Sequence, residues 1–232
     1  MKKKYFYSIS IVLSLFLFGC DVTQPINGKD ALNMRVAIET KYQQDSYANV
    51  FLEGADGNLI TGSTVLVVNS NAVAALLNFN FQESCYRGVL PPSADGQFNI
   101  EVISSLIEGK KTQKFSHYRL VEKPNLKILR DSNGVSALDG EILGVGNNIT
   151  ISWSNVSYAN VYQVAIQKNG IECFVISTDK LSIIINSQSM PGAGAYSCKI
   201  TAQYIKGDPL FTDKNFYSYS EAPGASVYFD VE

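Results

Sequence analysis

Side chains that could act as catalytic acids, bases or nucleophiles are few and scattered along the chain. The only histidine is His117, in the mixed polar and aromatic segment 113–119. A Ser-His-Asp arrangement would need this histidine, a serine on a sharp turn and a supporting acid. No Gly-x-Ser-x-Gly or comparable nucleophile motif occurs in the sequence. We therefore expect no catalytic role for His117 and interpret it as a strand or loop residue.

Motifs for metal or phosphate binding are also missing from the sequence. There is no His-Glu-x-x-His and no Cys-x-x-Cys, and the acidic loop 53–58 lacks the alternating oxygen ligands of a calcium loop. Asp56-Gly57 lies between two apolar runs and predicts a hairpin turn, because both residues tolerate positive φ. A hydrolase would need a deep pocket with paired acids, and no pair stands out among 21 acids. We predict a protein without enzymatic activity, metal or cofactor.

One cysteine, Cys20, has a defined sequence context at the N-terminus. Three lysines at 2–4 precede an uncharged run over 5–18, and Gly19 comes directly before the cysteine. A basic start, a short apolar segment and a small residue form the pattern of a secretory signal peptide. The apolar run is shorter than the roughly 20 residues of a membrane-spanning helix, so we expect it to be removed.

Leu17, Gly19 and Cys20 resemble the lipobox of bacterial lipoproteins, in which a diacylglyceryl group joins the cysteine thiol and a peptidase cuts before it. This resemblance implies a signal peptide over 1–19 and lipidation of Cys20. Residues 20–31 show no periodicity, so we expect a flexible tether. Acyl chains can hold a soluble domain at a bilayer. We therefore expect a cell-envelope protein that is lipid-anchored to the inner or outer membrane and faces the periplasm or the cell surface.

The other three cysteines are Cys85, Cys173 and Cys198. A disulfide can persist outside the cytoplasm, and a bridge between Cys173 and Cys198 would close a loop worth roughly 3 to 4 kcal/mol. The alternative is that both are buried free thiols, which are common. We keep the bridge as a possible disulfide and expect Cys85 to be buried and inert.

The composition indicates a mildly acidic all-β protein. The chain has 19 Lys and Arg against 21 Asp and Glu, and its nearest basic run, at 110–114, is too short for a nucleic-acid surface. Runs of Val, Ile, Thr and Tyr alternate with Gly, Asn, Asp and Pro clusters, which favours strands. About seven short strands before residue 122 suggest an Ig-like β-sandwich over 32–122. We place a boundary at 121–124, because Pro124 suits an interdomain joint.

The segment 123–232 carries a more specific pattern. Trp153 is followed by Val156, Ala159, Tyr162 and Val164 in the spacing Trp-x-x-Val-x-x-Ala-x-x-Tyr-x-Val. This spacing resembles two consecutive strands of a fibronectin type III module, and the segment 194–202 is similar to its sixth strand. The resemblance implies two tandem sandwiches, immunoglobulin-like then fibronectin type III-like. The physical pattern places a set of side chains in one core: Trp153, Tyr162, Val164, Tyr196, Ile200 and Ala202.

Aromatic loop residues are the candidates for a binding surface. In a fibronectin-like sandwich the connections cluster at the ends, so 155–158 and 206–215 could lie near each other. We select Tyr158, Phe211, Phe216 and Tyr217 as possible anchors, since Tyr and Phe give contact area at low entropic cost. The alternative for these residues is ordinary loop and strand packing.

These patterns together favour a non-enzymatic, envelope-anchored lipoprotein that acts as a binding, adhesion or structural module. The expected partners are the membrane, through the N-terminal lipid, and a protein or glycan that the sequence does not identify. Nucleic acid is not expected. The alternative is a glycan-binding accessory lipoprotein of a polysaccharide-handling system, which an exposed aromatic surface would support.

Overall fold

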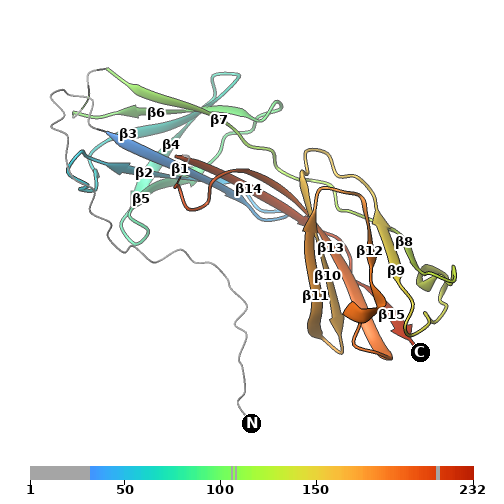
Figure 1. Cartoon of the computed structure of the whole chain (residues 1–232). Helices are drawn as coiled ribbons and strands as arrows, with labels where there is room; N and C mark the ends of the chain where they lie inside the picture. Colours follow the sequence, from blue (N-terminus) through green and yellow to red (C-terminus); the bar gives the residue numbers. More distant parts are fainter. Residues whose placement is uncertain (1–31, 106, 108, 213–214) are drawn as a thin grey trace, which may run out of the picture.

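The computed structural model describes residues 32–105, 107, 109–212 and 215–232, and over these residues the protein is all-β with sandwich-like sheets (Figure 1). The predicted signal peptide, Cys20 and the whole of the predicted tether lie outside the described residues. The first seven strands are β1 (Asn33–Thr40), β2 (Tyr47–Glu53), β3 (Thr64–Asn69), β4 (Ala74–Asn80), β5 (Cys85–Val89), β6 (Gln97–Ile103) and β7 (Lys111–Ser116). The later strands are β8 (Leu126–Asp131), β9 (Ile149–Trp153), β10 (Val161–Lys168), β11 (Ile171–Thr178), β12 (Ser182–Ile185), β13 (Gly194–Gly207), β14 (Phe216–Pro223) and β15 (Val227–Val231). Two short 3-10 turns cover Ala137–Asp139 and Ser187–Ser189.

Strands β8 to β15 form what we call the C-terminal sandwich. One layer is the three-stranded sheet β12-β9-β8, and the other is the part of the large sheet ordered β11-β10-β13-β14, with β15 also on β13. Side chains alternate along each strand because successive residues point to opposite faces of the sheet. The inward-facing residues of the two layers make one hydrophobic cluster. This arrangement agrees with the fibronectin type III-like sandwich expected from the sequence.

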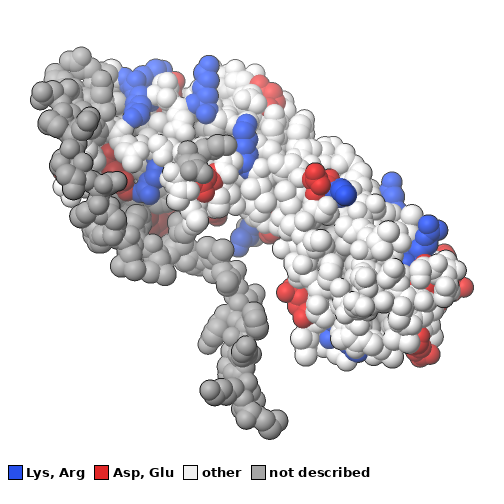
Figure 2. Space-filling model, in the orientation of Figure 1, with Lys and Arg blue, Asp and Glu red and all other residues white. Residues whose placement is uncertain are grey.

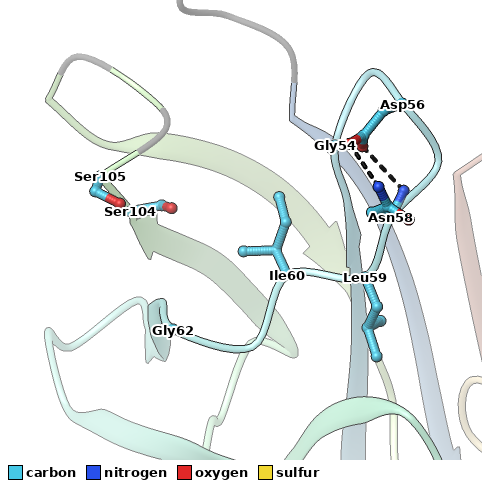
Figure 3. A pocket seen from close by; sticks show the side chains of 8 residues that line it. All are labelled: Gly54, Asp56, Asn58, Leu59, Ile60, Gly62, Ser104 and Ser105. Carbon is cyan, nitrogen blue, oxygen red and sulfur yellow. Dashed lines mark hydrogen bonds between the residues drawn. The ribbon is translucent and has the colours of Figure 1, made fainter.

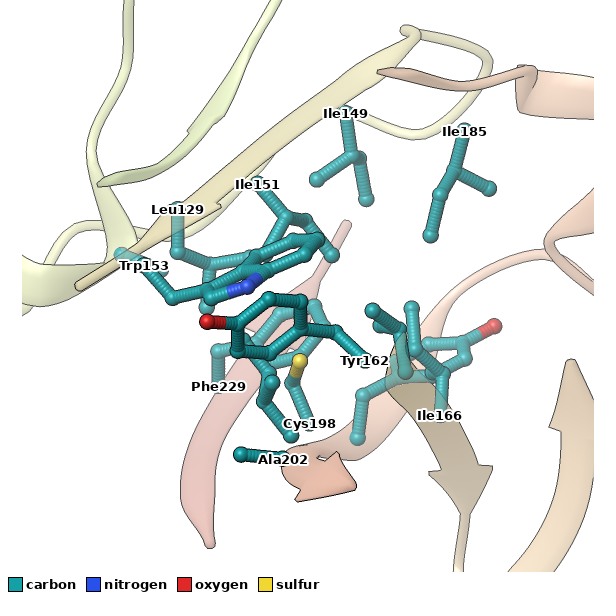
Figure 4. Close-up of a cluster of buried hydrophobic side chains, with 14 of the residues drawn as sticks. Leu129, Ile149, Ile151, Trp153, Tyr162, Ile166, Ile185, Cys198, Ala202 and Phe229 are labelled. Atoms are coloured by element: carbon teal, nitrogen blue, oxygen red, sulfur yellow. The ribbon is translucent and has the colours of Figure 1, made fainter. Parts of the chain in front are cut away.

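The core of the C-terminal sandwich contains every residue that the sequence assigned to it. Figure 4 shows Trp153 and Tyr162 packed together over Cys198 and Ala202, with ring centroids of the first two 5.7 Å apart. The six predicted core residues, Trp153, Tyr162, Val164, Tyr196, Ile200 and Ala202, are all buried. The Tyr196 hydroxyl donates a hydrogen bond to the Gly192 carbonyl at 2.5 Å, as expected for a tyrosine at a sandwich corner. The aromatic core prediction is therefore confirmed.

Strands β1 to β7 form the N-terminal sandwich, whose two layers share a strand. One layer is β4-β3-β6-β7 and the other is β1-β2-β5. Strand β4 pairs with β3 through Ala74–Leu77 and with β5 through Asn78–Asn80, so it crosses from one layer to the other. The predicted turn is present: Gly57 has φ 74°, and the Asp56 side chain accepts hydrogen bonds from Asn58.

Strand β14 belongs to both sandwiches. Its residues 217–223 pair with β13 in antiparallel fashion, and its residues 216–220 pair with β1 in parallel, with Ile38 opposite Ser218. The large sheet is therefore continuous from one sandwich into the other, and Phe216 packs against the N-terminal hydrophobic cluster. The predicted boundary at residue 122 does not separate the two cores completely, because part of the C-terminal segment completes the N-terminal sheet.

The structure corrects the possible disulfide between Cys173 and Cys198. Both thiols are free, because Cys173 lies on β11 and Cys198 on β13, and β10 runs between these two strands. Neighbouring strands are about 4.8 Å apart, so the two Cα atoms are roughly 10 Å apart, beyond the reach of a disulfide. Burial raises the pKa of the Cys198 thiol to about 12 and that of Cys85 to about 11, which keeps both protonated and inert at neutral pH.

Candidate functional site

The side chains closest to a catalytic geometry are His117 and Ser218, at the junction of the two sandwiches. His117 Nδ1 lies 2.8 Å from the Ser218 hydroxyl, and its Nε2 lies 2.8 Å from the Thr40 hydroxyl. A nucleophile must be reached by its substrate, but Ser218 is fully buried and His117 is 3% exposed. Burial also lowers the pKa of His117 to about 4, so the ring is a weak base. This pair therefore holds the junction together and does not form a substrate site.

The junction is a buried polar network that joins three distant segments. Ser46 lies 3.2 Å from His117 Nε2 and accepts a hydrogen bond from Thr40, while Ser220 accepts one from the Leu120 amide at 3.0 Å. Buried polar groups are costly unless they are paired. Because these hydroxyls are satisfied only when β1, β14 and the segment after β7 lie together, the network fixes the relation between the two sandwiches.

Tyr158, the first predicted binding residue, also lies at this junction. Its ring stacks on Tyr118 with centroids 4.3 Å apart and an angle of 6°, and Tyr118 meets Tyr204 edge-on at 5.3 Å. Tyr158 adopts φ 68°, a conformation that bulky residues rarely take. One face of this ring is occupied by an intramolecular contact, although the residue is still 57% exposed.

Phe211 and Phe216 are also engaged within the molecule. Phe211 packs edge-on against Phe51 at 6.4 Å and lies under the Arg35 guanidinium at 5.8 Å. Phe216 lies 5.6 Å from Phe115 in the N-terminal cluster. Phe216 therefore packs against the N-terminal core, which was the alternative to a binding role. Phe211 covers the edge of a surface formed by β1 and β2.

Tyr217 is the predicted residue that lies on a broad, partly exposed sheet face. It points away from the N-terminal core together with Tyr219, the two rings being near-parallel with centroids 6.4 Å apart. Pairing continues this face across the sheet, since Ala37 lies opposite Asn49, and Asn49 opposite Arg87. We call this surface the platform and define it by its half-buried and exposed residues: Arg35, Glu39, Tyr47, Asn49, Phe51, Arg87, Tyr217 and Tyr219.

The platform combines aromatic rings with charges of both signs. The Arg87 guanidinium lies over the Tyr47 ring at 4.9 Å. Burial, followed by hydrogen bonding to Glu221, raises the pKa of Tyr219, and burial with the nearby Glu39 raises that of Tyr217. Both phenols are therefore neutral donors at physiological pH. Tyr and Arg are the residue types that contribute most to the centres of protein interfaces, so this face is chemically suited to binding.

Sequence reasoning missed most of the platform. Tyr219 and Tyr47 were detectable as aromatic residues in alternating strands, but alternation alone assigns aromatic residues to the core. On β14 the assignment is reversed: Ser218 and Ser220 are fully buried, while the two tyrosines face outward. The signal that could have found them is the run Tyr-Ser-Tyr-Ser at 217–220, because the tyrosines must face outward if the alternating serines are buried against polar partners.

A shallow hollow of about 300 Å3 lies at the far end of the N-terminal sandwich (Figure 3). Its lining residues are Gly54, Asp56, Asn58, Leu59, Ile60, Gly62, Ser104 and Ser105. Among the described residues that line it, Asp56 is the only ionisable one, and hydrogen bonds from the Asn58 amide and side chain lower its pKa. A glycosidase needs a pair of acids, and the described lining supplies one.

Within residues 32–105, 107, 109–212 and 215–232, no cluster of three or more His, Cys, Asp or Glu could hold a metal ion. The same residues contain no helix that is long and apolar enough to cross a membrane.

Comparisons with known proteins give structural likeness only. No family model and no curated protein sequence matches the chain. Among solved structures, a cytokine receptor complex is 10% identical with a TM-score of 0.43 and covers 84% of this chain and 94% of its own. The FN1-FN3 domains of chicken CNTN1 are 11% identical with a TM-score of 0.41, covering 84% of this chain and 62% of theirs. The BSP domain of a biofilm associated protein is 14% identical with a TM-score of 0.28, covering 87% of this chain and 29% of its own. At these values nothing about function follows from the likeness.

Proposed function

We propose that this chain is a non-enzymatic binding module of the bacterial cell envelope, anchored by lipid on Cys20, and that the platform is its contact surface. The observation that carries the proposal is the position of the platform on a sheet shared by both sandwiches. A surface that includes the strand shared by two sandwiches is useful for binding when the sandwiches cannot move independently, because fixed contact groups lose little entropy on association. The junction network of His117, Thr40 and Ser218 supplies that rigidity.

The composition of the platform supports protein recognition. Interface centres are enriched in Tyr, Trp, Phe and Arg and depleted in Lys and Glu. The platform carries Tyr47, Tyr217 and Tyr219 together with Arg35 and Arg87, and the Arg87 guanidinium lies over the Tyr47 ring. The Arg35 side chain pairs with Glu53 and lies 5.7 Å from the Phe51 ring, so its orientation is fixed before any partner arrives.

The test of the platform is the loss of binding in a single-residue variant. The purified chain would be labelled and applied to cells of the producing strain that lack the gene, and retention would be measured by fluorescence. We expect Tyr219→Ala to reduce retention at least tenfold. Tyr228→Ala is the matched control, because Tyr228 is 79% exposed and lies on β15, outside the platform. Equal retention of both variants and the parent chain would contradict the proposal.

A glycan ligand is the second candidate, and one observation favours it. Tyr217 and Tyr219 present near-parallel rings, with Gln203 3.2 Å from the Tyr219 hydroxyl and Glu39 on the adjoining strand. Aromatic rings flanked by amide and carboxylate groups suit a sugar chain. A carbohydrate array probed with the parent chain and with Tyr219→Ala distinguishes the two candidates: a glycan signal that Tyr219→Ala removes supports the glycan, and a blank array supports a protein partner.

The anchor is tested separately from the platform. Cells would be grown with a palmitate analogue, and the parent chain and Cys20→Ala compared for label. The proposal expects label on the parent chain and none on the variant. A parent chain as blank as the variant would remove the anchor but leave the binding surface standing.

A further inference from the structure

The large sheet ends in two very different edge strands, β7 and β11. Strand β7 has the sequence Lys-Thr-Gln-Lys-Phe-Ser, with two lysines in six residues. Strand β11 has the sequence Ile-Glu-Cys-Phe-Val-Ile-Ser-Thr, in which Glu172 is the only charged residue. Charged side chains, lysine above all, are how proteins prevent edge strands from pairing with other chains. The β7 edge is protected in this way and the β11 edge is not.

The side chains of the β11 edge are apolar and exposed. Ile171 is 74% exposed, and Val175 and Ile176 are about 40% exposed, at 41% and 39%. Strand β12, the edge of the opposite layer, adds Ile184 at 71%. Figure 2 shows the side of the C-terminal sandwich that carries β10, β11 and β12 as largely uncharged, whereas Lys and Arg gather over the N-terminal sandwich. Exposed apolar side chains gathered at one edge of a sandwich are typical of an interaction site.

The backbone of β11 is also available for pairing. Within the described part of the chain, β10 is the only strand that pairs with β11. Alternate residues of an edge strand direct their N–H and C=O groups away from the sheet, where another strand can bond to them. An extended segment is therefore the kind of partner that this edge fits.

We infer that β11 pairs with β11 of a second copy of this chain, antiparallel and with Val175 opposite its own counterpart. This register places Phe174 opposite Ile176 on both sides of the two-fold axis, so three apolar residues face three apolar residues. Glu172 falls near Ser177 of the second copy, because the bulge at Cys173 shifts the register by one residue. The strand therefore meets itself without opposing like charges, which would be destabilising.

A two-fold pair is the closed assembly that these edges allow. If β11 of one copy joined β7 of the next, the chain of copies would be open-ended, and the lysines of β7 oppose this contact. A two-fold interface uses the same patch on both copies and closes after two. The resulting dimer has one continuous sheet running through four sandwiches, with a platform on each half.

The inference is tested in cells that make the full-length chain. A photo-crosslinking amino acid would replace Val175, and two copies with different tags would be expressed together. We expect irradiation to give a species containing both tags, in which mass spectrometry joins peptide 171–180 to the same peptide of the second copy. The matched control places the same amino acid at Thr112, which is exposed on β7, and it should give no such species.

A lysine placed on the β11 edge provides a second test of the dimer. Val175→Lys should weaken dimer formation at least tenfold, measured by light scattering of the full chain in mild detergent, while Thr112→Lys should leave it unchanged. Ile171→Lys, at a more exposed position, gives the same readout if Val175→Lys does not fold. A monomer at all concentrations, a dimer that ignores both lysine variants, or crosslinks from position 175 only to a different protein would each overturn the inference.

Discussion

The C-terminal sandwich is built from strands of its own segment, whereas the N-terminal sandwich takes a strand from the other half of the chain. Both layers of the C-terminal sandwich, β12-β9-β8 and β11-β10-β13-β14, come from residues after 125. In the N-terminal sandwich the open side of β1 is covered by residues 216–220 of β14. The N-terminal sandwich therefore depends on a strand from the C-terminal half of the chain, and we expect it to be the part that loses its folded structure when the two halves are separated.

This arrangement requires a long hairpin between β13 and β14 that begins with a sterically constrained glycine. Strand β13 runs for 14 residues, and the hairpin closes where the Asp208 amide donates to the Phe216 carbonyl at 2.9 Å. Gly207 has φ 89°, and a Cβ there would collide with the Phe216 carbonyl. Only glycine satisfies both conditions, so this residue fixes the direction in which β14 enters the N-terminal sheet.

The largest effect is expected from dividing the chain. The fragment 32–122 lacks β14 and exposes the edge of β1, so we expect it to lose cooperative unfolding, since both the backbone pairing of β1 with β14 and the packing of Phe216 are removed. The fragment 117–232 retains every buried residue of its own cluster and should unfold cooperatively. Circular dichroism during thermal unfolding measures both. If the fragment 32–122 unfolded cooperatively at the same midpoint temperature as the whole chain, the N-terminal sandwich would not depend on β14.

The next largest effect is expected from the junction. His117→Ala leaves the buried Ser218 hydroxyl without its His117 partner, while Thr40 keeps its hydrogen bond to Ser46. The substitution also opens a cavity, so the free energy of unfolding should fall by about 3–4 kcal/mol. Urea unfolding measures the change. Ser70→Ala is the control, because the exposed Ser70 hydroxyl contacts only the exposed Asp95 and should change stability by less than about 0.5 kcal/mol.

The pH dependence of stability should report the same histidine. The pKa of His117 is about 4 in the folded chain and 6.5 when free, so the unfolded chain binds the proton first as pH falls. Stability is then complete above pH 6.5 and declines toward pH 4, by up to about 3 kcal/mol. Urea unfolding at several pH values should show this slope in the parent chain and not in His117→Gln. Asp95 and Asp131, whose pKa values are lowered, contribute only below pH 4.

The smallest effect is expected from the stacked tyrosines. Tyr118 and Tyr158 should couple by about 1 kcal/mol in a double-mutant cycle of unfolding free energies, the usual size for an aromatic pair. The pair Phe79 and Phe81, with centroids 4.9 Å apart within the N-terminal sandwich, provides a comparison away from the junction. Additive effects of the two tyrosine substitutions would show that the stack does not connect the sandwiches.

The sequence predicted the parts of this fold that depend on local chemistry. The all-β class, the Asp56-Gly57 turn and the core around Trp153 followed from turn propensity and alternation, and the structure confirms them. The path of β14 could not be predicted in this way. The inward-facing residues of β14 are Phe216 in the N-terminal core, Ser218 and Ser220 at the junction, and Ala222 in the C-terminal core. A simple alternation of apolar and polar residues therefore does not identify the buried side of this strand.

The candidate surface was less predictable than the fold for a related reason. Of the four aromatic residues selected, Tyr217 lies on the platform, Phe211 covers its edge, Phe216 is in the N-terminal cluster and Tyr158 is at the junction. Loop position suggested exposure for all four. Which ring faces solvent depends on the parallel pairing between β1 and β14, which joins residues about 180 positions apart in the sequence, and no local pattern encodes it.

The parallel pairing of β1 with β14 is the claim on which the platform and the junction both depend, and nuclear Overhauser contacts test it directly. In a deuterated sample with protonated amides, we predict cross-peaks between residues 37 and 217 and between residues 39 and 219, together with slow exchange of the Val36 amide, which donates to the Asn215 carbonyl at 3.0 Å. Fast exchange of that amide and the absence of both cross-peaks in the folded chain would contradict the account.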